Sequence, residues 1–364
     1  MEVRQAVVLG AGMAGMACTR ILLRLGIRPL LVAPRQDVAI RGETLSFQAS
    51  PYLATLGWLE LLDAETALAS EGRYSVWGGG ALRRSASHQE EMSGWHLDRQ
   101  RLEARMAATL DADGVERVFA EARQLSRSPA QIIVELADGS SIATEFVVDC
   151  SGRSAITSGA EVSLRRLDRL VACYVIIPLG NDVEAMAATL VEAVAAGWWY
   201  MSIIPGDRML VGFFTDSDLL PSGFRKDAKL WPEMASQTVA VSARLASLGV
   251  DLTTSVELQF ASATTVTATK LVESRIVRAG DAACALDPLG ANGLATALWS
   301  GIRAAESVAR CIIDDDAATM AQYEQKFLQG IASHLATQTA LYASENRFPD
   351  APFWQRRRGS WLEN

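Results

Sequence analysis

Two apolar runs near the N-terminus are separated by a helical pattern. Ala6 to Leu9 form a short strand-like run, helical spacing continues to Gly26, and Arg28 to Ala33 form a second strand-like run. Short apolar runs predict buried strands, and a period of 3.6 residues predicts a helix. The order therefore predicts a strand–helix–strand unit.

The middle of the chain is rich in strand patterns. Before residue 150 we expect strands at 74–80, 92–97, 115–120, 131–136 and 141–148, and helices through 56–62 and 99–110. Strands then dominate from Val171 to Phe214, except for a helix expected over Val183 to Ala195. A helix over Trp231 to Leu248 and a strand over Ser255 to Val266 follow. This region predicts an antiparallel sheet with a covering helix.

The last part of the chain is mainly helical. A strand at Arg275 to Ala279 precedes a glycine-rich segment, and helical spacing begins after it. A buried helix face is predicted further on by five side chains at helical spacing: Tyr323, Phe327, Ile331, Leu335 and Tyr342. Pro349 and Pro352 are expected to end that helix.

Composition narrows the possible classes of protein. Hydrophobic residues make up 49% of the 364 residues and charged residues 21%, so a sizeable core can form and global disorder is excluded. The net charge of −8 argues against a nucleic-acid or anionic-membrane surface. Five cysteines without a CxxC pair indicate buried, reduced thiols, not a zinc site, which favours the cytoplasm. We expect neither a signal peptide nor a membrane-spanning helix.

A glycine fingerprint connects the first strand to the first helix. Gly10, Gly12 and Gly15 stand in the order GxGxxG, with Met13 and Ala14 between the last two. At a strand–helix junction, the first glycine makes a tight turn and the second lets a pyrophosphate approach the backbone. The third lets helix and strand pack closely. We therefore predict that an ADP moiety binds here.

One part of the dinucleotide pattern is missing. The second strand should end in an acid for the adenosine ribose, but the sequence there is Ala33-Pro34-Arg35. Losing one charge-assisted hydrogen bond costs about 1.5–3 kcal/mol, which a ligand as large as FAD tolerates. Arg35 is either a solvated loop residue or, as the alternative, a contact for the 2′-phosphate of NADP.

A second candidate region combines a strand end, a turn and a helix start. Its candidate cofactor-binding residues are Gly280, Asp281, Asp287, Pro288, Gly290, Asn292 and Gly293. A helix N-terminus offers unpaired N–H groups and partial positive charge, which suit a phosphate or a ring oxygen. The Asp281 carboxylate is placed to accept from a sugar or ribityl hydroxyl. We therefore predict that this region binds a flavin.

The two regions, together with Asp149-x-x-Gly152, resemble the FAD-dependent monooxygenase superfamily. The resemblance is to the para-hydroxybenzoate hydroxylase fold and its flavin-dependent halogenase branch. It implies an α/β protein with a Rossmann-like FAD-binding domain, an inserted, mostly antiparallel β-sheet substrate domain and a C-terminal helical segment. The implied FAD-binding domain is 1–72, 95–160 and 268–315, the substrate domain 73–94 and 161–267, and the C-terminal helix and tail 316–364.

The resemblance also implies roles for individual residues. The N-terminal glycines hold the FAD pyrophosphate, with Asp149 and Gly152 nearby. Asp281 holds the ribityl chain, and residues 288–293 line the isoalloxazine edge. Arg99 matches an arginine that contacts FAD in many relatives. Three further cofactor-binding candidates belong to a turn similar to the Gly-Glu-Ser-Leu turn of halogenases: Arg41, Gly42 and Glu43.

Within the superfamily, the halogenase pattern is incomplete. Where halogenases have the signature Trp-x-Trp-x-Ile-Pro, this sequence has Tyr200 and Ser202 in place of the two tryptophans. Halogenases also need a lysine in a segment that holds none of the four lysines here: Lys226, Lys229, Lys270 and Lys326. A closer similarity is to LodB/GoxB-type flavoproteins, which mature cysteine tryptophylquinone enzymes. Four stretches carry it: Trp77-Gly78 and residues 94–99, 197–200 and 348–357.

This resemblance implies hydroxylation of an electron-rich aromatic ring by a flavin C4a-hydroperoxide, with O₂ as co-substrate. The electron donor is NAD(P)H or a flavin reductase. We expect an indole-type substrate, either a tryptophan of a partner protein in tryptophylquinone maturation or a free aromatic metabolite. The alternatives are a halogenase and a nucleotide-binding protein without catalysis.

Four residues are candidates for the catalytic site: His96, Trp77, Trp199 and Tyr200. His96 is either an acid–base group or a hydrogen-bonded structural histidine. The aromatic residues form either a substrate wall or core, and successive residues of a strand must point to opposite faces.

Two further features have a structural and a functional interpretation. Cys284 is either a small buried filler or a covalent flavin link. Arg356 to Arg358 form either a solvated terminus or, with the aromatic residues Phe353, Trp354 and Trp361, a contact for a protein partner.

Overall fold

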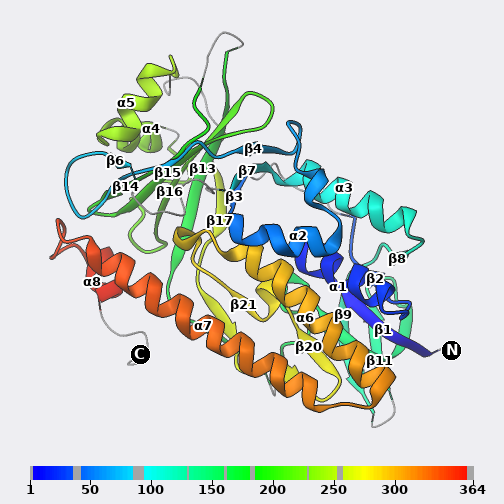
Figure 1. The fold of residues 1–364 in the computed structure, drawn as a ribbon. Coiled ribbons are helices and arrows are strands. Elements are labelled where there is room, and N and C mark those ends of the chain that lie inside the picture. The colour runs from blue at the N-terminus through cyan, green and yellow to red at the C-terminus, as the bar shows by residue number, and fades with distance from the viewer. Residues whose placement is uncertain are drawn as a thin grey trace.

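The computed structural model describes residues 3–35, 42–84, 94–128, 131–159, 162–180, 185–227, 229–251 and 257–358. These residues form two lobes, each built on one large β-sheet. The long helix α7 (Ala318–Ser344) runs along both lobes (Figure 1). The α/β class expected from the sequence is confirmed.

The larger lobe is organised around an eight-stranded sheet with a parallel centre. Its parallel strands lie in the order β20 (Ile276–Arg278), β11 (Ser141–Asp149), β1 (Val3–Leu9), β2 (Leu30–Val32) and β8 (Glu116–Val118). Three antiparallel strands extend it: β9 (Ala122–Arg127), β10 (Ile132–Leu136) and β19 (Val272–Glu273). Both faces of β1 are covered, which explains the continuous apolar run from Ala6 to Leu9.

Five helices share the main core with this sheet: α1 (Met13–Arg24), α2 (Ser50–Leu56), α3 (Arg99–Ala112), α6 (Gly293–Asp314) and the first part of α7. Helices α1 and α6 pack with their backbones almost in contact. A Cβ atom built on Gly301 of α6 would lie 2.2 Å from the carbonyl oxygen of Ala14 in α1. A side chain at this position would therefore force the two helices apart.

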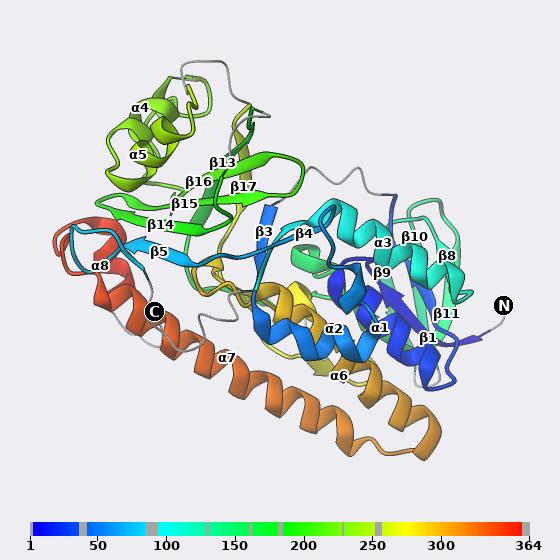
Figure 2. The ribbon, with the colours of Figure 1, turned by 45° about the horizontal axis from the view of Figure 1, so that its top comes forward.

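The smaller lobe contains a seven-stranded sheet. Its order is β17 (Gln259–Ser262), β13 (Leu170–Pro178), β16 (Arg208–Asp216), β15 (Gly197–Ile204), β14 (Thr189–Val194), β5 (Arg73–Val76) and β6 (Arg83–Arg84). All neighbours are antiparallel except β14 and β5. Helices α4 (Leu230–Ser236) and α5 (Ala240–Ser247) cover one face (Figure 2). The opposite face is turned toward the rest of the molecule.

Two three-stranded sheets complete the β structure. One has the order β3 (Gly42–Leu45), β7 (Trp95–Asp98), β4 (Ala67–Ala69), and the other β12 (Leu164–Arg166), β18 (Val266–Ala268), β21 (Cys284–Ala285). After α7, the short helix α8 (Pro352–Arg358) packs beside the seven-stranded sheet. Among the described residues, no helix combines the length and apolar character needed to cross a membrane.

The expected helix over Val183 to Ala195 is wrong. Residues 185–188 are irregular, Thr189–Val194 form strand β14, and residues 181–184 lie outside the described part. Pairing with β15 and β5 overrides the helical propensity of alanine and glutamate here.

The expected single helix over Trp231 to Leu248 is two helices. The Glu192 carboxylate of β14 accepts the N–H groups of Val239, Ala240 and Val241 at 2.6–2.9 Å, so a second helix starts there.

Two other boundaries differ from expectation. The strand expected over Ser255 to Val266 is divided between β17 and β18, which belong to different sheets, and residues 252–256 lie outside the described part. Helix α7 ends at Ser344, before Pro349, and Pro352 begins α8, a position where its missing N–H costs nothing.

The close approach of α1 and α6 can be tested by substitution. Gly301→Ala is expected to lower the free energy of unfolding by about 1–3 kcal/mol, because the added methyl overpacks the contact with Ala14. The matched control is Gly330→Ala in α7, where an added Cβ meets nothing within 4 Å. Gly330→Ala should raise the free energy of unfolding by up to about 1 kcal/mol, because alanine has a higher helix propensity than glycine. Urea unfolding measures both, and equal effects would contradict the packing described.

Candidate functional site

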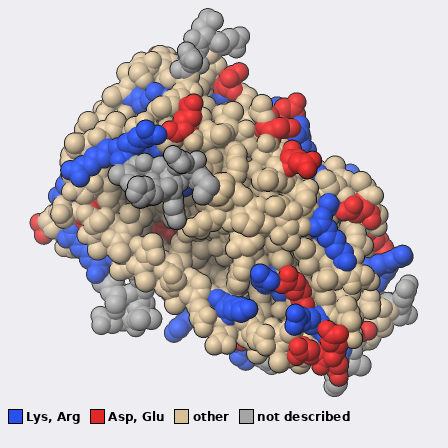
Figure 3. Space-filling view, viewed as in Figure 1, with Lys and Arg blue, Asp and Glu red and all other residues tan. Residues whose placement is uncertain are grey.

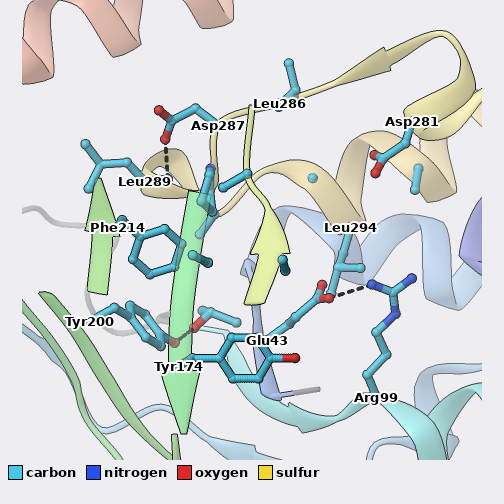
Figure 4. Close-up of a pocket in the computed structure, with 18 of the residues that line it drawn as sticks. Glu43, Arg99, Tyr174, Tyr200, Phe214, Asp281, Leu286, Asp287, Leu289 and Leu294 are labelled. Atoms are coloured by element: carbon cyan, nitrogen blue, oxygen red, sulfur yellow. Dashed lines mark hydrogen bonds and ion pairs between the residues drawn. The ribbon is translucent and has the colours of Figure 1, made fainter. Parts of the chain in front are cut away.

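A cavity of about 620 Å³ lies between the two lobes and is lined by residues of both. The space-filling view shows the surface hollowed between the smaller lobe and the start of α6 (Figure 3). Figure 4 shows charged and polar side chains at one end, among them Arg99, Glu43 and Asp281, and aromatic side chains at the other. The cavity therefore has a polar end and an aromatic end.

Two helices begin at the cavity. Gly12 and Met13 at the start of α1, and Gly293 and Leu294 at the start of α6, all line it. Neither helix has an acidic residue in its first turn. The unpaired N–H groups and partial positive charge of both helices are therefore available to an anionic or electron-rich ligand.

The N-terminal glycines have the steric roles expected of them. Gly10 has φ +101°, and a Cβ there would lie 2.3 Å from the carbonyl oxygen of Cys150. A Cβ on Gly15 would lie 1.8 Å from the carbonyl oxygen of Gly10. At Gly12 a Cβ would meet nothing within 4 Å, so the backbone there borders open space. These glycines shape a loop that a pyrophosphate can approach.

Arg99 and Glu43 form an ion pair at the cavity. Arg99 Nη1 lies 2.5 Å from Glu43 Oε1, and Arg99 Nε donates to Glu103 Oε1 at 2.9 Å. The charge of Glu43 raises the pKa of Arg99, so the guanidinium stays charged. Also at the cavity, Arg153 Nε lies 3.7 Å from Asp281 Oδ2.

Asp149 is buried and does not line the cavity. Its carboxylate accepts from the N–H and hydroxyl groups of Ser151 and of Thr157 at 2.6–3.0 Å. Asp149 thus fixes the loop that presents Gly152 and Arg153 to the cavity. In this geometry the Asp149 carboxylate has its contacts within the loop and not with the cavity.

The aromatic end belongs to the face of the seven-stranded sheet opposite α4 and α5. Trp198 and Phe214 stack with ring centroids 3.9 Å apart and an interplanar angle of 3°, and Tyr174 lies on the neighbouring strand β13. Tyr200 lies 2.6 Å from the Thr44 hydroxyl, and burial raises the pKa of Tyr200. The phenol therefore stays protonated and can donate or accept a hydrogen bond at the cavity wall.

The other catalytic candidates are placed differently. Trp77 lines the cavity and donates to the carbonyl oxygen of Leu341 at 3.0 Å. Trp199 faces α4, where it packs against Trp231, so its expected place in the substrate wall is wrong. The adjacent Trp198 occupies the cavity face, as the alternation of a strand requires.

His96 does not line the cavity. It is fully buried in β7, and its Nε2 lies 2.9 Å from the Thr189 hydroxyl. Burial lowers its pKa to about 4, so the ring is neutral at ordinary pH. This environment is that of a hydrogen-bonded structural histidine.

Of the cofactor candidates, eleven line the cavity: Gly12, Met13, Ala14, Glu43, Arg99, Gly152, Gly280, Asp281, Asp287, Pro288 and Gly293. Gly10, Gly15, Gly42, Gly290 and Asn292 lie in the adjoining backbone, and Arg41 lies outside the described residues. Their roles toward a cofactor remain predictions.

Sequence reasoning missed several cavity residues. Tyr174, Leu210 and Phe214 stand in long apolar strands, and the sequence does not show which face of each strand is covered. Arg73 and Arg153 also line the cavity, but neither belongs to a motif recognised in the sequence. Only the register of β13, β15 and β16 reveals which aromatic residues share a face.

Arg35 and Cys284 both have contacts within the protein, and their alternative roles toward a cofactor stay predictions. The Arg35 guanidinium lies over the ring of Phe119 at 4.7 Å, and Ala33 donates to the carbonyl oxygen of Val118. Cys284 is buried in β21, and burial raises its pKa to about 12, which suits a filler.

The C-terminal cluster expected to contact a partner is partly internal. Phe353 and Trp354 are buried, and Arg357 is buried in an ion pair of 2.7 Å with Asp216. Arg356 and Arg358 are exposed, so a partner contact by these two arginines stays a prediction; Trp361 lies outside the described residues.

The site fits an FAD molecule. Open backbone at Gly12 and Gly293 offers two helix N-termini to a pyrophosphate and a ring, while Asp281 and Arg99 supply polar contacts between them. The cavity continues to its aromatic end, which Trp198, Phe214, Tyr174 and Tyr200 line.

Comparison with known proteins identifies the class. The family model described as tryptophan halogenase matches residues 63–363, so the chain belongs to that family. The protein that carries the name FAD-dependent oxidoreductase LodB, from Marinomonas mediterranea, is 26% identical over 371 residues, covering 98% of this chain and 97% of LodB. The resemblance stated above is thus confirmed, and the chain is an FAD-dependent oxidoreductase.

Solved structures agree with this assignment. The peptidyl tryptophan dihydroxylase QhpG, essential for tryptophylquinone cofactor biogenesis, has a TM-score of 0.81 and 25% identity, covering 98% of this chain and 79% of QhpG. The flavin-dependent halogenase CmlS has a TM-score of 0.83 and 19% identity, covering 100% and 71%, which shows a shared fold.

Acidic pH should destabilise the fold through His96. Its pKa is about 4 in the folded chain against 6.5 ordinarily, so between these values the unfolded chain binds the extra proton. Stability therefore rises with pH across this window and is lost as pH falls through it, by up to roughly 3 kcal/mol. His96→Gln should flatten the pH dependence of the free energy of unfolding between pH 7 and pH 5. An unchanged slope in urea titrations would contradict this.

Proposed function

We propose that this protein is an FAD-dependent monooxygenase that hydroxylates an electron-rich aromatic ring, and that the ring is a tryptophan side chain of a partner protein. The observation that carries the proposal is that one cavity joins the starts of α1 and α6 to the stacked pair Trp198 and Phe214. A cofactor at the polar end and an aromatic ring at the other would therefore meet inside one cavity.

The reaction inserts one oxygen atom of O₂ into a ring C–H bond, and the other leaves as water. Two electrons come from NAD(P)H or a flavin reductase, and two protons from solvent. FAD, when bound, supplies the activation of O₂. The chain's own part is to bind and orient both rings and to exclude water.

Individual residues support these tasks. The two helix N-termini and Arg99 would hold the cofactor, and Trp198, Phe214 and Tyr174 would hold the substrate ring by stacking. Tyr200, protonated and hydrogen-bonded to Thr44, would hold a proton at the wall between them.

A protein substrate is supported by the relatives. QhpG acts on a peptidyl tryptophan, and LodB aligns over nearly the whole chain. Hydroxylation of a free aromatic metabolite is the alternative. Halogenation is favoured by the family name, but none of the four lysines, Lys226, Lys229, Lys270 and Lys326, lines the cavity.

The experiment supplies the FAD-loaded protein with a flavin reductase, NADH, O₂ and either a tryptophan-containing peptide or free tryptophan, with and without bromide. Mass spectrometry should show one or two oxygen atoms added to the peptide and no bromine. Oxygen added only to free tryptophan would select the metabolite hydroxylase. Bromination, or no product from a flavin-loaded protein, would overturn the proposal.

The adjacent tryptophans give a matched control. Trp198→Leu should raise KM for the aromatic substrate about tenfold, since an aromatic stacking pair contributes about 0.5–1.5 kcal/mol beyond the area it buries. Trp199→Leu removes the same side chain from the opposite face and should lower stability while leaving KM unchanged. Equal effects on KM would contradict the assigned faces.

A further inference from the structure

Asp287 is a buried carboxylate at the cavity wall, 1% exposed. It directly precedes the short turn Pro288–Gly290, which leads to α6. Its Oδ1 accepts the N–H of Leu289 at 2.8 Å (Figure 4). The carboxylate therefore fixes the turn that borders the start of α6.

The other carboxylate oxygen reaches a different part of the molecule. Tyr342 of α7 donates its hydroxyl to Asp287 Oδ2 at 2.8 Å, and the same hydroxyl accepts the indole N–H of Trp198 at 3.2 Å. Trp198 stacks on Phe214 at the aromatic end. Three side chains thus form one hydrogen-bonded chain from the turn beside α6 to the aromatic wall.

Tyr342 is held rigidly in this position. It is fully buried and packs edge-on against Phe353 and Trp354 of the C-terminal helix. The Arg357 guanidinium lies 5.2 Å from its ring centroid and is ion-paired with Asp216. A small displacement of Tyr342 would therefore require repacking of this buried cluster.

The charge of Asp287 depends on these neighbours. Burial raises the pKa of Asp287 to about 6; the Leu289 N–H, the Tyr342 hydroxyl and the charge of Arg357 oppose the rise, and Asp168 adds to it. His334 of α7 faces Gly290, and burial lowers the pKa of His334. Above about pH 6 the carboxylate accepts both hydrogen bonds, and below it a proton occupies one oxygen.

We propose that Asp287 is a positioning residue for both ends of the cavity. Through Leu289 it fixes the turn beside the cofactor end, and through Tyr342 it orients Trp198 at the substrate end. The inference rests on the proposed function, since it assigns the two ends to FAD and to the aromatic substrate. Tyr342 does not itself line the cavity, but its two hydrogen-bond partners, Asp287 and Trp198, do.

The test compares Tyr342→Phe, Asp287→Asn and the double variant. Tyr342→Phe should weaken FAD binding and raise substrate KM, each about tenfold, the equivalent of one hydrogen bond of about 1.4 kcal/mol. In the double variant, FAD affinity and KM should change no more than in the more strongly affected single variant, because both substitutions break the same hydrogen-bonded chain. The matched control is Tyr323→Phe, a buried tyrosine of the same helix that donates to the carbonyl oxygen of Arg278 at 2.6 Å. It should change neither constant.

The dependence of FAD affinity on pH gives a readout independent of turnover. Titration of the apoprotein with FAD should show tighter binding above about pH 6 than below it in the wild type, and no such change in Asp287→Asn. Should Tyr342→Phe fail to fold, Asp287→Asn serves in its place: an amide keeps only one of the two acceptor oxygens, so this variant should weaken FAD binding or raise KM. Unchanged FAD affinity and KM in folded Tyr342→Phe would overturn the inference. Failure of the wild type to bind FAD at all would instead overturn the proposed function.

Discussion

The arrangement of the site depends on the contact between α1 and α6. The carbonyl oxygen of Ala14 lies where a side chain of Gly301 would be, and a Cβ on Gly280 would lie 2.8 Å from the Cβ of Ala14. Because glycine allows this approach, the starts of two helices far apart in the sequence face one cavity. Their unpaired N–H groups then act on the same ligand, which neither helix could achieve alone.

The smaller lobe provides the aromatic wall of the cavity. Its sheet is buried on both faces, with α4 and α5 on one side and the cavity and C-terminal cluster on the other. One face is therefore core and the other a wall of aromatic side chains. The helix α7 joins the lobes, since Tyr323 contacts the larger lobe and Tyr342 the smaller one. The C-terminal segment thus packs on the same sheet face as the substrate wall, where Phe353 and Trp354 are buried and Arg357 is held in a buried ion pair with Asp216.

Local patterns predicted much of the larger lobe. The GxGxxG spacing identified the first strand, turn and helix, and the Gly280 to Gly293 stretch identified the second helix start, because these depend on backbone conformation within a few residues. The sequence could not show that both carboxylate oxygens of Asp149 accept hydrogen bonds from Ser151 and Thr157. Partners of a buried carboxylate are decided by loop packing.

The smaller lobe was predicted less well for a physical reason. Its strands are apolar on both faces, so the sequence carries no alternation from which to assign Trp198 to the cavity and Trp199 to the core. Strand pairing also overrode the helical character of residues 189–194, and Glu192 started a helix 47 residues away in the sequence. These outcomes depend on tertiary contacts.

A crystal structure of the protein with FAD and a tryptophan-containing peptide tests the central claim most directly. The account predicts the flavin ring beside residues 288–293 and the indole against Trp198 and Phe214, both inside the one cavity. A flavin ring bound elsewhere, or an indole bound outside the cavity, would contradict it.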